Sequence, residues 1–525
     1  MRASSVSVLI AVTSAMFLGC TLTRAPASPE GADGSATGSA DAGAGGDAAG
    51  PNTIDVKCPT LAMPTGSATA YVDGRSAGSE DGSKASPFRT LAKALATAPP
   101  NGVVWVAAGS YRENLVAPDK GLTIVGGFTP GFASRTDACA TVVEAADAKK
   151  PVITAPAGVE GLGLDGLTVQ KGSRGLQAES DGGPTQGTFT IANAVFADNG
   201  TVDGEGGGVS FDRVHGRISG SVFRNNRASK GAAIAAAGDV TLRIEGSTFE
   251  RNVGHSDHGG ALYLGTRSAT ITRNTFRSNE IGKDVGYGWG GGVILYGNGA
   301  QPVKGDLSYN VFTDNLASVG AAVFVDDGAS VTMSHDLIFR NRAYRENGVA
   351  RGAAIYVDGL GGPTEGSTLV ADHLTVAFNA YDETGAPAGS SRGGGVYMES
   401  YSKATFTNSI FWKNGEEPLF GDPTCALDVR YSVAPSSCGG GAACSVGAGV
   451  FEPTEIHFVD EARNDYHEKS TAGHFAGGAW VKDAVTSPAI DKADPAKGGD
   501  TEPMPNGGRA NLGAYGHTGE ASKSP

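Results

Sequence analysis

The chain has 525 residues, of which 80 are glycine, and its 55 acidic and 41 basic side chains give a formal net charge of −14. Such negative charge without a basic cluster predicts no nucleic-acid partner, because phosphate binding needs grouped lysine and arginine side chains. After the first 20 positions, no apolar run is long enough for a membrane-spanning helix. Length alone predicts three or four domains, but internal repeats override that estimate.

Residues 1–20 have the pattern of an export signal, in which Met1 and Arg2 precede an apolar run that ends at Cys20. The pattern resembles a bacterial lipoprotein signal, which implies that Cys20 is lipidated. The alternative is an ordinary secretory signal with a chance cysteine. Residues 21–57 lack aromatic residues and predict a disordered tether. We therefore expect an exported, monomeric protein of the bacterial cell envelope, held at the outer membrane by its lipid anchor alone.

Five further cysteines are disulfide candidates in an exported protein: Cys58, Cys139, Cys425, Cys438 and Cys444. Cys58 with Cys139 would tie down the start of the folded body, and two of the later three would close a loop near its end. One cysteine is then left over.

Residues 58–160 are expected to hold the N-terminal coils and cap of the fold. The segments Tyr71–Asp73, Ser86–Leu91, Gly109–Glu113 and Gly126–Phe128 resemble the opening coil of many bacterial β-helix proteins. This resemblance implies that residues 91–98 form a short helix that caps the open core.

Residues 161–424 contain a repeat with a period near 27 residues, which is typical of a solenoid. One half is Phe-x-x-Asn, beginning at Phe196, Phe223, Phe249, Phe276, Phe312 and Phe411, with degenerate copies at Phe339 and Val376. The other half is a glycine cluster followed by an aliphatic residue, beginning at Gly206, Gly231, Gly259, Gly290, Gly320, Gly352 and Gly393.

The alternation of aliphatic residues after each glycine cluster predicts strands, and the Gly and Asn runs predict turns. We expect an all-β fold, a single-stranded parallel β-helix of about eleven coils, in which Phe side chains stack in the core and Asn side chains stack along a turn. The repeats resemble those of chlamydial polymorphic outer-membrane proteins and of right-handed, pectate-lyase-like β-helix proteins. Residues 425–525 hold the Cys-containing last coils, and Ser487–Asp491 with Asn511–Tyr515 resemble the closing segment of such proteins.

Strand parity places one column of aromatic side chains on the outside of the coils: Tyr263, Phe324, Tyr356 and Tyr397. Three long insertions, 280–289, 343–351 and 380–392, begin beside this column and add Tyr287 and Trp289. Aromatic rings on a solvent-facing sheet stack against sugar rings, so these residues are candidate ligand-binding residues. The alternative is an aromatic ladder that only stabilises the coils.

The next outward position places Asp326, Asp358 and Glu399 in register on consecutive coils, about 4.8 Å apart. Carboxylates this close are tolerated when one is protonated or when a cation such as calcium lies between them. They are candidate catalytic residues, since similar proteins that cleave polyuronates use outward carboxylates. The alternative is that these residues belong to turns in solvent, and no Arg or Lys shares their register.

His255, Asp257 and His258 have the residue types of metal ligands, although a polar turn has the same composition. Together these observations predict a non-catalytic, surface-anchored binding or adhesin-like lipoprotein that recognises glycan or a cell-surface partner. The alternative function is an enzyme, a lyase or a glycoside hydrolase acting on acidic polysaccharide.

Overall fold

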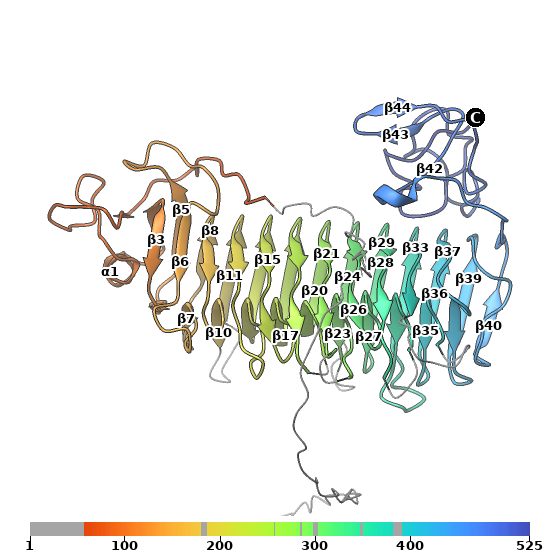
Figure 1. Ribbon diagram of the computed structural model, residues 1–525, viewed down its shortest axis with the longest axis horizontal. Coiled ribbons are helices and arrows are strands. Elements are labelled where there is room, and N and C mark those ends of the chain that lie inside the picture. Colours follow the sequence, from red (N-terminus) through yellow and green to blue (C-terminus); the bar gives the residue numbers. More distant parts are fainter. Residues whose placement is uncertain are drawn as a thin grey trace, which may run out of the picture. The chain divides into compact units, whose positions relative to one another are not determined.

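Each repeat forms one coil of a parallel β-helix, and successive coils stack along one axis (Figure 1). The computed structural model describes residues 57–179, 186–256, 258–283, 286–297, 303–346, 350–381 and 391–525. These residues belong to one compact unit, residues 56–525. Cys20, the expected signal and nearly all of the expected tether lie outside the described residues. No helix among the described residues is long and apolar enough to cross a membrane.

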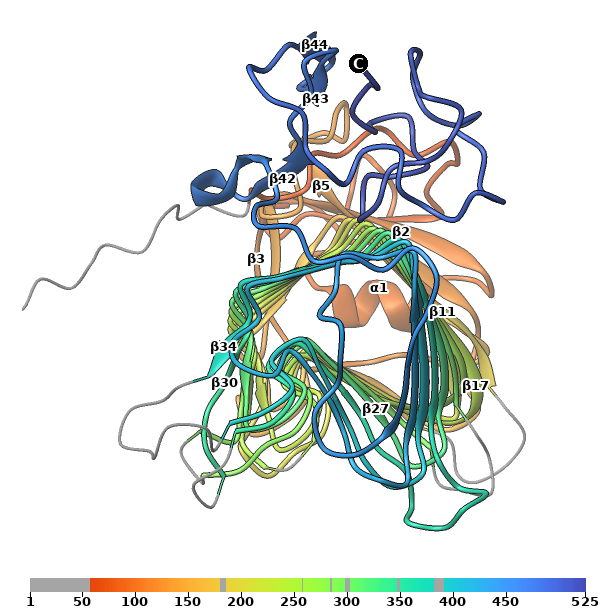
Figure 2. The ribbon, with the colours of Figure 1, turned by 90° about the vertical axis from the view of Figure 1, so that its right-hand side faces the viewer.

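The coils form three parallel sheets, whose strands superpose when viewed along the solenoid (Figure 2). One sheet contains eleven strands: β3 (Gly109–Arg112), β6 (Thr141–Glu144), β9 (Thr168–Gln170), β12 (Val195–Ala197), β15 (Val222–Arg224), β18 (Thr248–Glu250), β21 (Thr275–Arg277), β25 (Val311–Thr313), β29 (Leu337–Phe339), β33 (Thr375–Ala377) and β37 (Ile410–Trp412). A shorter sheet follows it in six coils: β16 (Arg227–Ala228), β19 (Val253–Gly254), β22 (Glu280–Ile281), β26 (Leu316–Ala317), β30 (Arg342–Ala343) and β34 (Ala380–Tyr381).

The largest sheet has 23 strands in two ladders, joined by the long strands β17 (Ile234–Glu245) and β20 (Leu262–Thr272). The first ladder follows the glycine clusters and adds β4 (Leu115–Val116), β7 (Ile153–Ala155), β10 (Leu176–Glu179), β13 (Val209–Asp212), β23 (Val293–Tyr296), β27 (Val323–Asp326), β31 (Ile355–Val357), β35 (Val396–Met398) and β38 (Leu419–Gly421). The second ladder adds β1 (Ala70–Val72), β2 (Gly102–Ala107), β5 (Leu122–Phe128), β8 (Leu162–Asp165), β11 (Gln186–Ala192), β14 (Val214–Ser219), β24 (Lys304–Ser308), β28 (Ser330–Ser334), β32 (Thr368–Asp372), β36 (Lys403–Thr407), β39 (Ala426–Arg430) and β40 (Ala443–Val446).

The core confirms the predicted stack of phenylalanines. Phe196, Phe223, Phe249, Phe276 and Phe312 are fully buried, and neighbouring rings lie parallel with centroids 4.7–5.1 Å apart. The asparagines three positions later form a buried ladder from Asn199 to Asn414, each carboxamide bonding to the next coil. Repeating the same two residues therefore satisfies both the apolar core and the polar backbone of the turns.

One repeat was assigned to the wrong residue. The register pairs Phe312 with Ile338, so Ile338 takes the core position that the sequence pattern gave to Phe339. Phe339 points away from the core and packs against Tyr466, with ring centroids 4.8 Å apart. Asn341 is consequently in phase with the ladder, since it lies three positions after Ile338 and bonds to Asn379.

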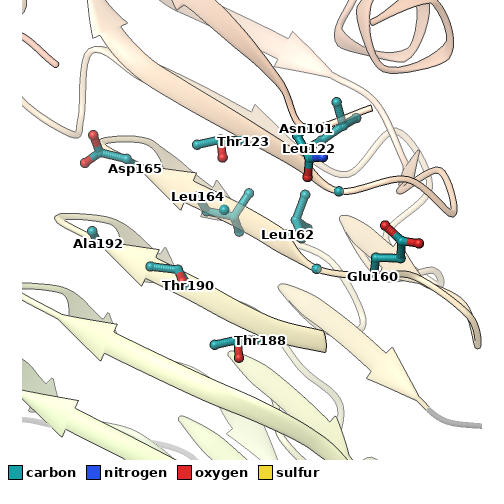
Figure 3. A pocket seen from close by; sticks show the side chains of 13 residues that line it. Asn101, Leu122, Thr123, Glu160, Leu162, Leu164, Asp165, Thr188, Thr190 and Ala192 are labelled. Carbon is teal, nitrogen blue, oxygen red and sulfur yellow. The ribbon is translucent and has the colours of Figure 1, made fainter. Parts of the chain in front are cut away.

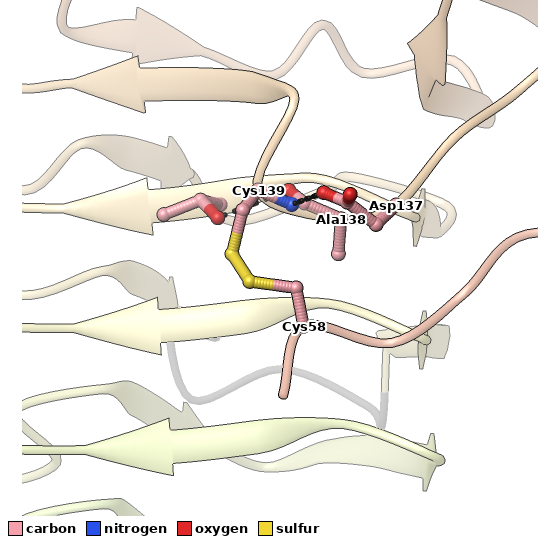
Figure 4. Close-up of a disulfide and its surroundings, with 5 residues drawn as sticks. Cys58, Asp137, Ala138 and Cys139 are labelled. Atoms are coloured by element: carbon pink, nitrogen blue, oxygen red, sulfur yellow. Dashed lines mark hydrogen bonds between the residues drawn. A yellow bond between two sulfur atoms is a disulfide. The ribbon is translucent and has the colours of Figure 1, made fainter. Parts of the chain in front are cut away.

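The N-terminal end is closed by the predicted capping helix, α1 (Leu91–Thr97), whose Leu91, Ala94 and Leu95 are buried. The Glu113 carboxylate accepts the N–H groups of Leu91 and Ala92 at 2.8 and 2.9 Å, so it satisfies the helix N-terminus. Of the candidate disulfides, Cys58–Cys139 is formed (Figure 4). Cys438–Cys444 is also formed, and buried Cys425 is the one left over.

The C-terminal segment folds back against the outer side of the last coils (Figure 2). It contains β41 (Phe458–Asp460), the 3-10 turn η1 (Glu461–Arg463), β42 (Asp465–Glu468), β43 (His474–Ala476) and β44 (Ala479–Val481). An apolar cluster joins it to the β-helix: Leu337, Phe339, Ala377, Ile410, Val433, Ile456, Phe458, Tyr466, Ala489, Ala493, Ala510, Leu512 and Ala514. This contact explains why the outer positions of β29, β33 and β37 are apolar.

Candidate functional site

Two columns of side chains meet at the glycine turns on the outside of the first ladder. One column precedes the glycines, and isolated parallel bridges join its members: His258, Trp289, Val319, Arg351 and Arg392. The other follows the glycines on the strands: Tyr263, Ile294, Phe324, Tyr356, Tyr397 and Phe420. The turn between them needs glycine, because Gly320 has φ +58° and an added Cβ would lie 3.0 Å from the Phe324 Cβ.

Side chains of the first column cover rings of the second column that lie one coil further along the solenoid. Arg351 lies over Tyr397 with 6.0 Å to the centroid, Arg392 over Phe420 with 5.1 Å, and the Trp289 ring meets Phe324 edge-on. Phe324, Tyr356 and Tyr397 are consequently only 3, 2 and 8% exposed. The prediction that these three rings face solvent is therefore wrong, because the preceding turns and insertions cover them, whereas Tyr263 is half-buried.

Beside the buried rings lies a cavity of about 400 Å³, which we call the acidic pocket. Its size falls within the range of small-molecule sites. It is lined by His258, Trp289, Tyr296, Val319, Phe324, Asp326, Asp327, Glu346, Arg351, Tyr356, Asp358 and Glu399. All three candidate catalytic carboxyl groups therefore share one cavity with three of the candidate aromatic residues, Phe324, Tyr356 and Trp289.

The carboxyl groups come from three consecutive coils. Asp326 ends β27, whereas Asp358 and Glu399 come directly after β31 and β35. The parallel ladder still continues there, since the N–H of Asp358 donates to Val325 O and that of Glu399 to Val357 O. Asp358 and Glu399 thus stand where strand becomes turn, yet they line the pocket.

Burial perturbs two of these acids. Asp326 is 5% exposed, and burial, reinforced by Asp327 and Asp358, raises its pKa well above the ordinary aspartate range. Burial also raises the pKa of Asp358 to about 6, with Glu399 and Asp327 adding to the shift and hydrogen bonds from Ser400 and Gly359 opposing it. The surroundings of Asp326 therefore favour its protonated, neutral form.

The remaining polar groups hold the walls in place. The Tyr356 hydroxyl donates to Oε1 of Glu399, and burial, together with Glu399, raises the pKa of Tyr356 well above 10. Glu346 Oε2 accepts from Trp289 Nε1 at 3.4 Å and from Ser318 Oγ at 3.1 Å. Burial alone would lower the pKa of Arg351, but neighbouring Tyr356, Tyr397 and Glu399 raise it, so the guanidinium is charged.

The other candidate residues lie at the margin of the pocket or away from it. Tyr263 and Tyr397 pack against the apolar cluster beneath the pocket, and Tyr287 is 41% exposed on an insertion. His258 lines the pocket and its ring meets Trp289 and Tyr296 edge-on, whereas His255 does not line it. Asp257 lies outside the described residues.

The geometry offers no preformed metal site in the described part of the chain. There, three potential ligand atoms come within 4.8 Å of one another only at Cys58, Asp137 and Cys139, and both of those sulfurs are bonded in a disulfide. Neither His255 and His258 nor the pocket carboxylates belong to such a set. The residues present therefore do not fit a resident calcium ion.

Two residues of the pocket, Arg351 and Glu346, were not predicted from the sequence. The strand register considered only the residues that follow the glycine clusters, and neither residue is among them. Arg351 instead belongs to the column before the glycines, and Glu346 lies on the insertion. The sequence does contain a pattern that points to this column. Aromatic or basic residues directly precede several glycine clusters: Lys230, His258, Trp289, Arg351 and Arg392.

Two other hollows of about 450 and 540 Å³ lie on the second ladder. The first is lined by small polar side chains such as Thr123, Thr188 and Thr190, with Glu160 and Asp165 at its edges (Figure 3). Neither combines aromatic rings with perturbed ionisable groups. The acidic pocket is therefore the stronger candidate site, although it is the smallest of the three.

Comparison with known families supports the fold. A model described as "Right handed beta helix region" matches residues 158–367, in agreement with the parallel β-helix fold of the chain. A model described as a protein of unknown function (DUF1565) matches residues 72–117, and one described as "Disaggregatase related" matches residues 436–493. No curated protein sequence matches the chain.

Three solved structures are among those similar to this chain. Pectate lyase Pel9A is 13% identical with a TM-score of 0.38, covering 85% of this chain and 95% of its own. Pectin methylesterase from carrot is 13% identical with a TM-score of 0.20, covering 75 and 91%. The GH136 lacto-N-biosidase from Eubacterium ramulus is 10% identical with a TM-score of 0.28, covering 73 and 68%.

Proposed function

We propose that this protein is an exported, lipid-anchored β-helix protein that binds an oligosaccharide in the acidic pocket. The observation that carries the proposal is the lining of one cavity by aromatic rings and by several hydrogen-bonding carboxyl groups. Sugars are bound by this combination, because their C–H faces stack on rings while their hydroxyls bond to carboxylates. Export and anchoring rest on the pattern of residues 1–20.

The buried Tyr356 and Tyr397 make poor test sites, since truncating them would unfold the local structure. Trp289 and Tyr296 are partly exposed and line the same pocket. Trp289→Ala and Tyr296→Ala should each weaken oligosaccharide binding about tenfold or more in calorimetric titrations. Tyr309→Ala is the matched control, because Tyr309 is 43% exposed but lies outside the pocket. Equal binding by all three variants would exclude the pocket as the binding site.

A specific observation supports hydrolysis as a second candidate function. Glycoside hydrolysis uses one protonated carboxyl group as acid and one carboxylate as base or nucleophile. The surroundings of Asp326 favour its protonated form, and Oε1 of Glu399 accepts a hydrogen bond from the Tyr356 hydroxyl. New reducing ends on neutral or amino-sugar oligosaccharides, lost in Asp326→Asn, would establish an enzyme. Their absence on every substrate would leave binding alone.

A further inference from the structure

The charge of the acidic pocket is unbalanced. Five of its lining residues are acidic, namely Asp326, Asp327, Glu346, Asp358 and Glu399. Among the described residues that line the pocket, Arg351 is the single arginine or lysine, and the Arg351 guanidinium already lies over the Tyr397 ring. Within the described part of the chain, Asp326, Asp327, Asp358 and Glu399 form no ion pair with a basic side chain within 4.0 Å. An acidic sugar placed here would meet like charges in a partly desolvated cavity, which is costly.

The opposite wall favours a cation for an independent reason. Trp289, Tyr296, Phe324 and Tyr356 line the cavity, and the faces of such rings attract ammonium groups. Trp289 and Tyr296 are partly exposed, so they offer ring surface to a ligand. The His258 ring holds both in place by edge contacts, with centroids 4.8 and 5.5 Å away. Carboxylates and ring faces thus converge on the same space.

The burial of the acidic side chains also favours a cationic ligand. Burial, and after it the neighbouring carboxyl groups, make Asp326 and Asp358 resist ionisation. An ammonium group between them offsets that repulsion and lets them ionise around it. A ligand with hydroxyls alone cannot provide this compensation.

We propose that the ligand is an oligosaccharide with free amino groups, of the glucosamine type, and that one ammonium group binds between Asp326, Asp358 and Glu399. This inference rests on the proposed saccharide-binding function. The inference names the class of sugar, and it disfavours acidic polysaccharide, which was the substrate of the alternative function predicted from the sequence.

The test is calorimetric titration of the full chain at about pH 6, with matched-length oligomers of glucosamine, N-acetylglucosamine and galacturonic acid, and with spermine as a cation that is not a sugar. The glucosamine oligomer should bind at least about tenfold more tightly than its acetylated counterpart, and the galacturonate oligomer weakest. Asp358→Asn and Glu399→Gln should each remove most of that preference. Asp212→Asn is the matched control, because Asp212 ends β13 on an earlier coil and lies outside the pocket.

The outcomes separate the two proposals. Equal binding of the acetylated and deacetylated oligomers would overturn the amino-sugar inference and leave the saccharide site in place. Binding of no oligomer would overturn both. Spermine binding as tightly as the glucosamine oligomer would identify a general cation site and overturn the saccharide assignment. A preference that survives both pocket variants would place the amine elsewhere.

Discussion

The Asn252 carboxamide donates a hydrogen bond of 2.9 Å to Oδ1 of Asn279 in the next coil, and the same oxygen accepts the Asn252 N–H at 3.1 Å. The Asn279 carboxamide in turn donates to the carbonyl of Phe249 at 3.0 Å. One side chain therefore satisfies three polar groups that are shielded from water, and the arrangement repeats from coil to coil.

Asn279→Ala should destabilise the protein by about 3 kcal/mol or more, since each buried polar group left without a partner costs about 1–3 kcal/mol. The measurement is the urea midpoint of unfolding. Thr332→Ala is the control, because Thr332 is exposed on β28 and its loss should change stability by less than about 0.5 kcal/mol. A similarly small effect at Asn279 would show that the ladder is dispensable.

Asp326→Asn should stabilise the protein at neutral and alkaline pH while weakening ligand binding. Burial raises the pKa of Asp326 in the folded state, so the folded protein holds a proton that the unfolded chain releases. Its contribution is fully present below the unfolded aspartate pKa and is lost as the pH rises toward the folded value. The neutral Asn avoids this loss.

Thermal unfolding should therefore show a higher melting temperature for Asp326→Asn at about pH 8, and no difference near pH 4. Asp212→Asn supplies the comparison, because the Asp212 side chain is 44% exposed. If Asp326→Asn were less stable at both pH values, Asp326 would be a structural hydrogen-bonding residue rather than a strained acid.

Truncating Phe312 and truncating Phe339 should destabilise different parts of the protein. Phe312 stacks on Phe276 inside the core, whereas Phe339 anchors the C-terminal segment through Tyr466. Phe312→Ala should cost about 3–5 kcal/mol and unfold the coils. Phe339→Ala should leave the β-sheet circular dichroism unchanged but speed protease cleavage beyond residue 456. Identical cleavage patterns for the two variants would contradict this division.

The repeat predicted the core of the β-helix correctly, apart from one position. It predicted only part of the pocket, because the rest depends on contacts between segments distant in the sequence. Phe-x-x-Asn fixes a register locally, because each coil repeats the same buried environment. Where Phe339 and Ile338 compete for the core, the outcome depends on whether a partner exists outside, and Tyr466 lies 127 positions further along the chain. Strand parity identified Asp326, Asp358 and Glu399 as neighbours. It could not show that Arg351 and Trp289 cover the rings, because the course of an insertion depends on tertiary packing.

The last prediction concerns a stack of imidazoles at the contact between the β-helix and the C-terminal segment. The His335 ring stacks on Tyr309 at 4.8 Å and on His373 at 5.1 Å, and His373 stacks on His517 of the C-terminal segment at 5.8 Å. Two charged groups also face the stack. Oδ1 of Asp372 lies 3.1 Å from Nδ1 of His373, and Oδ2 of Asp372 lies 3.2 Å from Nζ of Lys497. The backbone carbonyl of Ala514 lies 3.2 Å from Nδ1 of His335.

Burial, reinforced by His373, lowers the pKa of His335 from 6.5 to about 4, although Asp372 and the Ala514 carbonyl oppose the shift. The folded state therefore binds fewer protons than the unfolded chain between these two values, so stability falls as the pH falls from 6.5 to about 4 and levels off below. The loss is at most about 1.4 kcal/mol per pH unit before solvent screening reduces it.

His335→Phe keeps a stacking ring without a titratable group, so wild type should lose stability relative to the variant over this range. His215→Phe, on β14 and outside this contact, should not alter the pH dependence. Parallel stability curves for wild type and His335→Phe would show that the stack does not sense pH.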